Sequence, residues 1–351
     1  MRARSLMFKL IRSILPVALL AMSMGTVLAQ DPQFSQYYQA PLYLNPGFTG
    51  ITPQQRAVFN NRIQWPNLPQ AYTTFAASYD IWVDELRSGF GIMATTDKMG
   101  SAGWRTTTAG LSYSYKVRLN DKIVFSPGLY FGYGINGLDQ SKLRLGDGLE
   151  YNGISLDPEL QKLGNQQYFD FGSGFLLYSR ALWIGASFNH MNTPNLSILN
   201  GVSRLAMKTT IHGGARIPLY NGPRTMARIS YLTPSFIFRV QGPVTQLDFG
   251  LNYHIDPVSI GVWYRGKPYE KNYIGTANQD ALIFQMGLYL KNFTIGYSYD
   301  FSISQLSAAS GGAHEISVVY EFVAKPLHRG MKKRNRLIPC PTFNSKAGFW
   351  N

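Results

Sequence analysis

Residues 293–301 read Phe-Thr-Ile-Gly-Tyr-Ser-Tyr-Asp-Phe, with a large apolar or aromatic residue at every odd position and a small or polar one at every even position. A period of two residues puts each class on one face of a β-strand. The same alternation runs through residues 123–136 and 246–255. Runs of roughly nine to thirteen residues are typical of tilted strands that cross a membrane, whereas strands of soluble sheets average about five or six. The pattern therefore predicts an outer-membrane β-barrel.

The rest of the chain extends the pattern to about fourteen strands of an all-β, antiparallel, up-and-down transmembrane barrel. We expect them at 54–64, 71–81, 87–98, 104–118, 122–135, 168–178, 181–190, 207–217, 225–240, 244–255, 257–266, 279–290, 293–302 and 313–322. Tight turns, such as 120–121 and 291–292, alternate with longer links, such as 136–167 and 191–206. An even strand count with short periplasmic turns predicts that both mature termini are periplasmic. A secreted β-sandwich is the soluble alternative, and its strands are shorter.

The N-terminus has the features of a cleavable signal peptide, residues 1–29. Four basic residues without an acid precede an apolar run at 14–22, and small residues end at Ala29. That run is too short to span a bilayer as a helix, which needs about twenty residues. The expected organisation is then a segment at 30–52, the barrel at 53–323 and a tail at 324–351.

The charge is unevenly distributed. The formal net charge is +14, but four basic residues lie in the signal peptide and seven follow Glu321, the last acid. The distribution indicates targeting and a basic tail, not a nucleic-acid partner. Cys340 is the only cysteine, so an intramolecular disulfide and zinc sites built on cysteine pairs are excluded.

The sequence contains little evidence of a catalytic or cofactor-binding motif. Residues 132–137 match G-x-G-x-x-G, but they lie in an alternating strand with no helix after it. The five histidines have no spacing that puts two on one face, and no G-x-S-x-G elbow exists. We therefore expect no enzymatic activity, cofactor or metal, although a barrel esterase could assemble a Ser-His pair across strands.

The segment at 30–52 is rich in proline, aromatic and amide residues and ends in turn chemistry at Asn45-Pro46-Gly47. We expect an ordered but irregular stretch, which is either a plug inside the barrel or a docking surface for a partner. Its candidate docking residues are Asp31, Pro32, Phe34, Ser35, Gln36, Tyr37, Asn45, Pro46, Gly47 and Gly50.

The tail is basic in its first half and aromatic near its end. It is either a solvated extension or a segment that folds on a periplasmic partner, with charges that steer and aromatic anchors that hold. A closed barrel offers it no free edge, so we expect the tail to add little to barrel folding. Its candidate docking residues are Arg329, Lys332, Lys333, Arg334, Arg336, Pro339, Cys340, Pro341, Phe343 and Trp350.

The signal peptide followed by Gln-Asp-Pro-Gln-Phe-Ser-Gln-Tyr at 30–37 and Leu-Asn-Pro-Gly-Phe-Thr-Gly at 44–50 closely resembles the opening of the PorP/SprF family of type IX secretion system membrane proteins. Pro339-Cys340-Pro341 after a basic run resembles the end of some members. The resemblance implies a non-enzymatic barrel in the outer membrane of a Bacteroidota-type bacterium. It also implies a component or adaptor of the secretion and gliding apparatus, with two kinds of partner: the periplasmic ring-forming lipoprotein complex, and a secreted cargo such as an adhesin with its sorting domain.

A different class of outer-membrane protein is also consistent with the sequence. A channel or transporter for hydrophobic solutes could have the same strand number and an N-terminal plug. Either protein would have outer-membrane lipid around its outer face.

Overall fold

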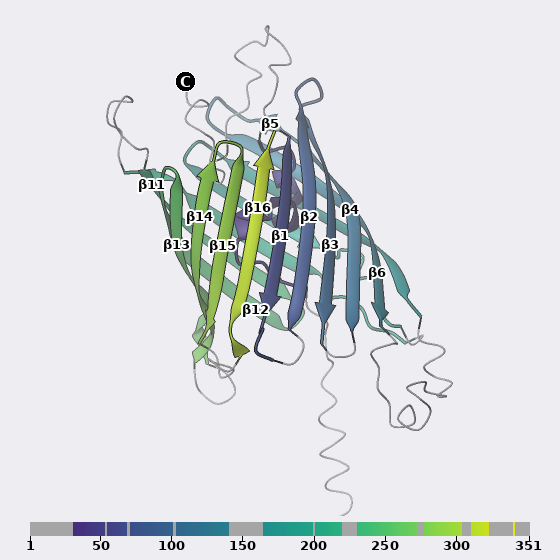
Figure 1. Cartoon of the computed structure of the whole chain (residues 1–351). Helices are drawn as coiled ribbons and strands as arrows, with labels where there is room; N and C mark the ends of the chain where they lie inside the picture. Colours follow the sequence, from purple (N-terminus) through teal and green to yellow (C-terminus); the bar gives the residue numbers. More distant parts are fainter. Residues whose placement is uncertain are drawn as a thin grey trace, which may run out of the picture.

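The computed structural model describes residues 31–52, 55–68, 71–100, 103–139, 164–198, 201–219, 230–271, 277–303, 310–322 and 340. Within them the chain forms an antiparallel sheet that closes into a barrel, because its first strand pairs with its last (Figure 1). In that closing pair Arg56 lies opposite Glu321 and Gln64 lies opposite Ala313. The predicted all-β, up-and-down barrel is confirmed.

The wall has fourteen strands, because two of its sixteen strand segments are two-residue continuations of their predecessors. Each strand pairs with its neighbours in chain order. The segments are β1 Arg56–Gln64, β2 Tyr72–Val83, β3 Ser88–Met99, β4 Trp104–Tyr115, β5 Val117–Arg118, β6 Val124–Leu138, β7 Gln166–Tyr178, β8 Leu182–Asn189, β9 Lys208–Ala215, β10 Ile217–Pro218, β11 Ser230–Gln241, β12 Val244–Ile255, β13 Val258–Lys271, β14 Ala277–Leu290, β15 Phe293–Ser302 and β16 Ala313–Glu321.

The boundaries differ from the prediction in a few places. The expected strands 104–118 and 207–217 are each interrupted by one residue, Lys116 and Arg216. The Lys116 amine donates a hydrogen bond to the carbonyl of Gly50 inside the barrel, and Arg216 lies 3.8 Å from the Tyr231 ring centroid. β6 and β13 extend beyond their expected ends, because the pairing of β6 with β4 continues to Leu138 and the pairing of β13 with β14 continues to Lys271. The expected start of the 225–240 strand lies outside the described residues up to Ser230.

The two faces of the wall follow the alternation in the sequence. In β15 the side chains of Phe293, Ile295 and Tyr297 are exposed on the outer surface, whereas Ser298 and Asp300 are buried on the lumen side. The predicted facing of residues 293–301 is therefore confirmed. A slip by one residue would exchange the two faces, so the alternation fixes the register wherever one face is apolar.

The barrel has two different ends. The short-turn rim is the end where β1 begins and β16 ends, and it carries the turns at 84–87, 119–123, 179–181, 256–257 and 291–292. The long-connection rim is the opposite end, where β6, β8, β13 and β15 end and where longer stretches of sequence separate them from the strands that follow. No helix among the described residues is long and apolar enough to cross a bilayer.

Candidate functional site

Residues 31–52, which we call the plug segment, lie inside the barrel (Figure 1). They contain three short helical turns, η1 (Tyr37–Gln39), α2 (Pro41–Leu44) and η2 (Pro46–Phe48). The last two turns begin with proline, where the missing N–H would have had no helical partner. Ser35 and Phe48 are fully buried. The segment therefore packs against the lumen wall as a folded unit.

The plug segment runs from one rim to the other. Asp31 contacts Lys208 and Gln241 at the long-connection rim, whereas Gly50 contacts Asp80 near the short-turn rim. The first described residue and the end of β16 consequently lie at opposite rims. The expectation that both mature termini are periplasmic stays a prediction, since Gln30 and the end of the chain lie outside the described residues. Only the strand ends share a rim, because the plug segment crosses the lumen before β1 begins.

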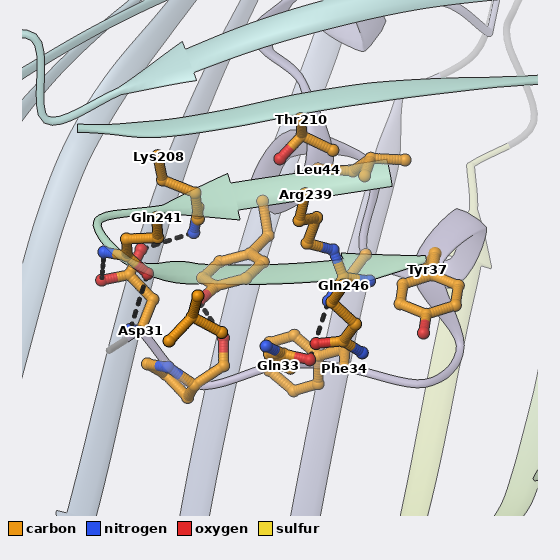
Figure 2. Close-up of a pocket in the computed structure, with 14 residues that line it drawn as sticks. Asp31, Gln33, Phe34, Tyr37, Leu44, Lys208, Thr210, Arg239, Gln241 and Gln246 are labelled. Carbon is orange, nitrogen blue, oxygen red and sulfur yellow. Dashed lines mark hydrogen bonds and ion pairs between the residues drawn. The ribbon is translucent and has the colours of Figure 1, made fainter. Parts of the chain in front are cut away.

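Asp31 is held at the long-connection rim by two cationic side chains, of which Figure 2 shows Lys208. His190 Nε2 lies 2.7 Å from Asp31 Oδ2, and Lys208 Nζ donates to the same oxygen. His190 Nδ1 lies 2.9 Å from Asp170 Oδ1, so the imidazole bridges two carboxylates. Burial alone would lower the pKa of His190, but Asp31 and Asp170 raise it to about 9. Burial would raise the pKa of Asp31, but His190 and Lys208 hold it well below its usual range. We call these four side chains the Asp31 latch.

Ser35 lies at the centre of a group of buried charges. Its Oγ donates to Asp300 Oδ2 at 2.6 Å and accepts from Arg62 Nη1 at 2.7 Å and Arg265 Nη2 at 2.9 Å. Both guanidinium groups also pair with Asp300, at 2.7 and 2.9 Å. The backbone N–H of Ser35 donates to Glu315 Oε2 at 2.6 Å. A hydroxyl suits this position because it donates to a carboxylate and accepts from guanidinium at the same time.

Tyr37 continues the charged contacts toward the middle of the lumen. Its hydroxyl donates to Asp248 and accepts from Arg265 Nη2, with a distance of 2.8 Å to the nitrogen. The guanidinium carbon of Arg239 lies 4.6 Å from the centroid of the ring. In Figure 2, Arg239 reaches Gln33 as well, at 2.9 Å. Side chains of β11, β12 and β13 thus hold the same aromatic residue.

The second half of the plug segment packs closely against the wall at Asn45, Pro46 and Gly47. Asn45 Oδ1 accepts from the N–H of Gly47 at 2.8 Å and so caps η2, while its Nδ2 donates to the carbonyl of Phe175 at 2.9 Å. A Cβ on Gly47 would lie 2.8 Å from the carbonyl oxygen of Ser126 in the wall. Only glycine allows the backbones to approach this closely.

Gly50 ends the plug segment under two constraints. Its φ of +59° is in the left-handed region, and a Cβ there would lie 2.7 Å from the Cα of Gly89 in β3. Its N–H donates to Asp80 Oδ2 at 2.8 Å, and Arg56 Nη2 donates to that carboxylate oxygen at 3.0 Å. The spacing Asn-Pro-Gly-x-x-Gly thus places two glycines where the segment touches the wall.

The predicted N-terminal candidates all lie inside the barrel, spread along the plug segment from one rim to the other. They are Asp31, Pro32, Phe34, Ser35, Gln36, Tyr37, Asn45, Pro46, Gly47 and Gly50. Of the ten tail candidates only Cys340 is described. It is buried in an apolar cluster with Leu176, Tyr178 and Trp183. The other candidates lie outside the described residues, namely Arg329, Lys332, Lys333, Arg334, Arg336, Pro339, Pro341, Phe343 and Trp350.

The ionisable residues that contact the plug segment, or that pair with those contacts, are absent from the predicted site. They are Arg56, Arg62, Asp80, Asp170, His190, Lys208, Arg239, Asp248, Arg265, Asp300 and Glu315. A signal for most of them exists in the sequence, because an ionisable residue inside a membrane strand has to face the interior and find a partner. The partners themselves cannot be paired from sequence, since they come from strands far apart along the chain. Among the described residues no group of three or more potential ligands is arranged to hold a metal ion.

Comparison with known proteins adds to this picture. Among solved structures, the chain is similar to the toluene transporter TodX of P. putida, with a TM-score of 0.45 and 11% identity over 80% of this chain and 93% of that one. It is also similar to the siderophore receptor PirA from Acinetobacter baumannii (TM-score 0.34, 9% identity, 71% of this chain and 43% of that one). A Rhodopseudomonas blastica porin mutant gives a TM-score of 0.33 and 8% identity, over 77% of this chain and 99% of that one. A comparison with curated proteins finds no match.

The family comparison is more informative, because it covers most of the chain. Residues 26–320 match the family described as type IX secretion system membrane protein PorP/SprF. The match includes the plug segment together with the barrel. It agrees with the resemblance of residues 30–50 to the opening of that family. The chain therefore belongs to the PorP/SprF family of type IX secretion system membrane proteins, and it is an outer-membrane β-barrel.

Proposed function

We propose that this protein is a plugged, non-enzymatic adaptor of the type IX secretion apparatus, which helps to export or retain a cargo protein rather than conduct solutes. The observation that carries the proposal is that the plug segment is bound to the wall at both rims and in the middle. Removing one partner of a buried ion pair costs about 3–5 kcal/mol, so the segment is difficult to displace. A channel or transporter with an N-terminal plug would have to release this segment before a solute could pass.

The proposed orientation follows the general pattern of outer-membrane barrels, with short turns in the periplasm and long connections outside. The end of β16 then faces the periplasm, where the basic tail can contact the ring-forming lipoprotein complex. The long-connection rim faces the exterior, where a cargo such as an adhesin sorting domain is retained. Asp31 and its latch then lie at the cell-surface end of the lumen.

The test is deletion of the gene, followed by quantitative surface proteomics with an impermeant biotin reagent. We expect one or a few secreted proteins to disappear from the surface while growth on a small hydrophobic solute is unchanged. Complementation with the wild-type chain, or with Gly164→Ala, should restore display. Gly164 suits a control because an added Cβ meets nothing within 4 Å. An unchanged surface proteome with impaired solute uptake would support a transporter instead.

The non-enzymatic part of the proposal has its own test. A fluorophosphonate probe should leave the detergent-extracted, full-length barrel unlabelled, since a cross-strand esterase would carry an activated serine. Stoichiometric labelling that heat denaturation abolishes would contradict it.

A further inference from the structure

A cavity of about 360 Å³ lies between the plug segment and the wall near the long-connection rim. Strands β3, β4, β6 and β7 form its wall, and Leu42 and Tyr43 of the plug segment line its inner side. The connection after β8 contributes Leu196 and Leu205, which pack with Tyr168 in one buried cluster. The volume is within the range of roughly 300–1,000 Å³ that is typical of small-ligand sites.

The cavity is lined mainly by aromatic and apolar side chains. Tyr43, Tyr130, Tyr168 and Trp104 contribute rings, and two methionines of β3 add flexible apolar surface. An added Cβ at Gly134 would overlap the Tyr168 ring, so this glycine makes room for the aromatic lining. Several aromatic rings around one space are suited to a cationic group with an apolar stem.

Asp97 supplies the charge that such a ligand needs. The other two carboxylates in the lining, Asp31 and Asp170, are already paired within the Asp31 latch. Asp97 is 94% buried at the cavity surface, and Thr74 Oγ1 donates a hydrogen bond to its Oδ1 at 2.5 Å. Within the described ranges, no lysine, arginine or histidine side chain forms an ion pair with Asp97. The cavity therefore carries one carboxylate that lacks a cationic partner among these residues.

We propose that this cavity binds a lysine or arginine side chain of a secreted polypeptide, with the cationic group at Asp97 and the alkyl stem along the rings. This inference rests on the proposed function and names the chemistry of the segment that the barrel recognises in its cargo. A charge-assisted hydrogen bond satisfies the buried carboxylate, which is otherwise unfavourable in an apolar site. The remaining volume beside Met93 and Met99 takes an apolar neighbour of the cationic residue.

Peptide binding to the full-length barrel in detergent tests the inference. The probes are acetyl-Phe-Lys-Phe-amide and acetyl-Phe-Gln-Phe-amide, titrated by calorimetry. We expect the lysine peptide to bind at least tenfold more tightly, and Asp97→Asn to abolish this preference. Asp97→Asn is isosteric and keeps an acceptor for Thr74, and Met93→Trp is a second variant that should weaken both peptides by filling the cavity. Asp121→Asn, in an exposed turn, is the matched control and should retain the preference.

Three results would overturn the inference. The first is equal affinity for the two peptides, and the second is an unchanged preference in a folded Asp97→Asn barrel, where heat-modifiable migration reports folding. The third is binding of n-butylammonium as tightly as the lysine peptide, which would indicate a site for small amines. Failure of the proposed function is distinguishable, because gene deletion would then leave the surface proteome intact whatever the peptides do.

Discussion

The two halves of the plug segment are held to the barrel by different forces. The first half, residues 31–39, makes ion pairs and charged hydrogen bonds through Asp31, Ser35 and Tyr37. The second half, residues 45–50, is held mainly by close backbone contact at Gly47 and Gly50, with Asn45 as a cap. One end therefore depends on charge and the other mainly on shape.

The two halves of the plug segment should therefore respond differently to their surroundings. Charged contacts weaken when a partner titrates or is removed, whereas a close glycine contact depends on volume alone. The charged half also begins, at Asp31, at the rim where we place the cargo. A ligand at that rim can therefore alter the first half while the second half stays seated.

The largest expected effect is at the Ser35 centre. Arg62→Ala leaves Asp300 and Glu315 without one of their cationic contacts, and the loss should destabilise the folded barrel by about 3–5 kcal/mol. The measurement is the urea midpoint of the barrel in detergent. Arg118→Ala, in an exposed turn pair, is the control and should change stability by less than about 1 kcal/mol. Equal effects of the two substitutions would show that the buried charges do not hold the segment.

The next effect breaks the shape-based half. A Cβ at Gly89 would overlap the carbonyl of Thr49, so Gly89→Val should displace the end of the plug segment. We expect a loss of about 1–3 kcal/mol and faster hydrogen exchange at 45–50. Gly164→Ala should leave both quantities unchanged. Wild-type exchange in Gly89→Val would contradict the role of close packing.

A smaller and reversible effect belongs to the Asp31 latch. The pKa of His190 is raised from 6.5 to about 9. The stabilisation of the folded state by protonated His190 is therefore complete below pH 6.5 and is lost as pH rises through 9. The lowered pKa of Asp31 has the opposite consequence. The stabilisation of the folded state by ionised Asp31 is present above pH 3.8 and is lost as pH falls. Exchange at residues 31–35, corrected for intrinsic rates, should therefore increase above pH 9, while exchange at 45–50 does not.

Two substitutions in the Asp31 latch separate the contributions of Asp31 and His190. Asp31→Asn should cost about 1–2 kcal/mol at pH 7, and His190→Gln should remove the change in exchange above pH 9. A pH response that persists in His190→Gln would exclude this histidine as its source.

The smallest effect on stability is expected for the tail. Deletion of residues 326–351 should leave a heat-modifiable barrel, since β16 already closes the wall on β1. The loss of Cys340 from its apolar cluster should cost no more than about 1 kcal/mol. Display of the cargo should nevertheless be abolished, because the basic tail is proposed to dock on periplasmic machinery. Wild-type display by the truncated chain would show that the tail is a solvated extension.

The alternation in the sequence was sufficient to predict the wall. Local residue types determine which face of a strand is apolar, so the facing of 293–301 and the strand count followed from periodicity. The breaks at Lys116 and Arg216 did not follow from it, because the alternation does not show that Lys116 contacts Gly50 or that Arg216 contacts the Tyr231 ring.

The site was predictable only in part, and for a physical reason. Residues 30–52 stood out by composition and by their resemblance to the PorP/SprF family, but their partners are spread over the whole barrel. Ser35 meets Arg62 in β1, Arg265 in β13 and Asp300 in β15, and no local pattern links these positions. The path of the plug segment across the lumen was missed, because the parity of the strands constrains only the ends of β1 and β16.

The most direct test of a seated plug is the conductance of the full-length barrel in a planar bilayer. Wild-type protein should give no steady conductance at neutral pH, because residues 31–52 occupy the lumen. Arg62→Ala should give intermittent openings as the charged half detaches, and Gly164→Ala should behave as wild type. A stable open conductance of the wild-type chain would contradict the plugged adaptor and favour a channel.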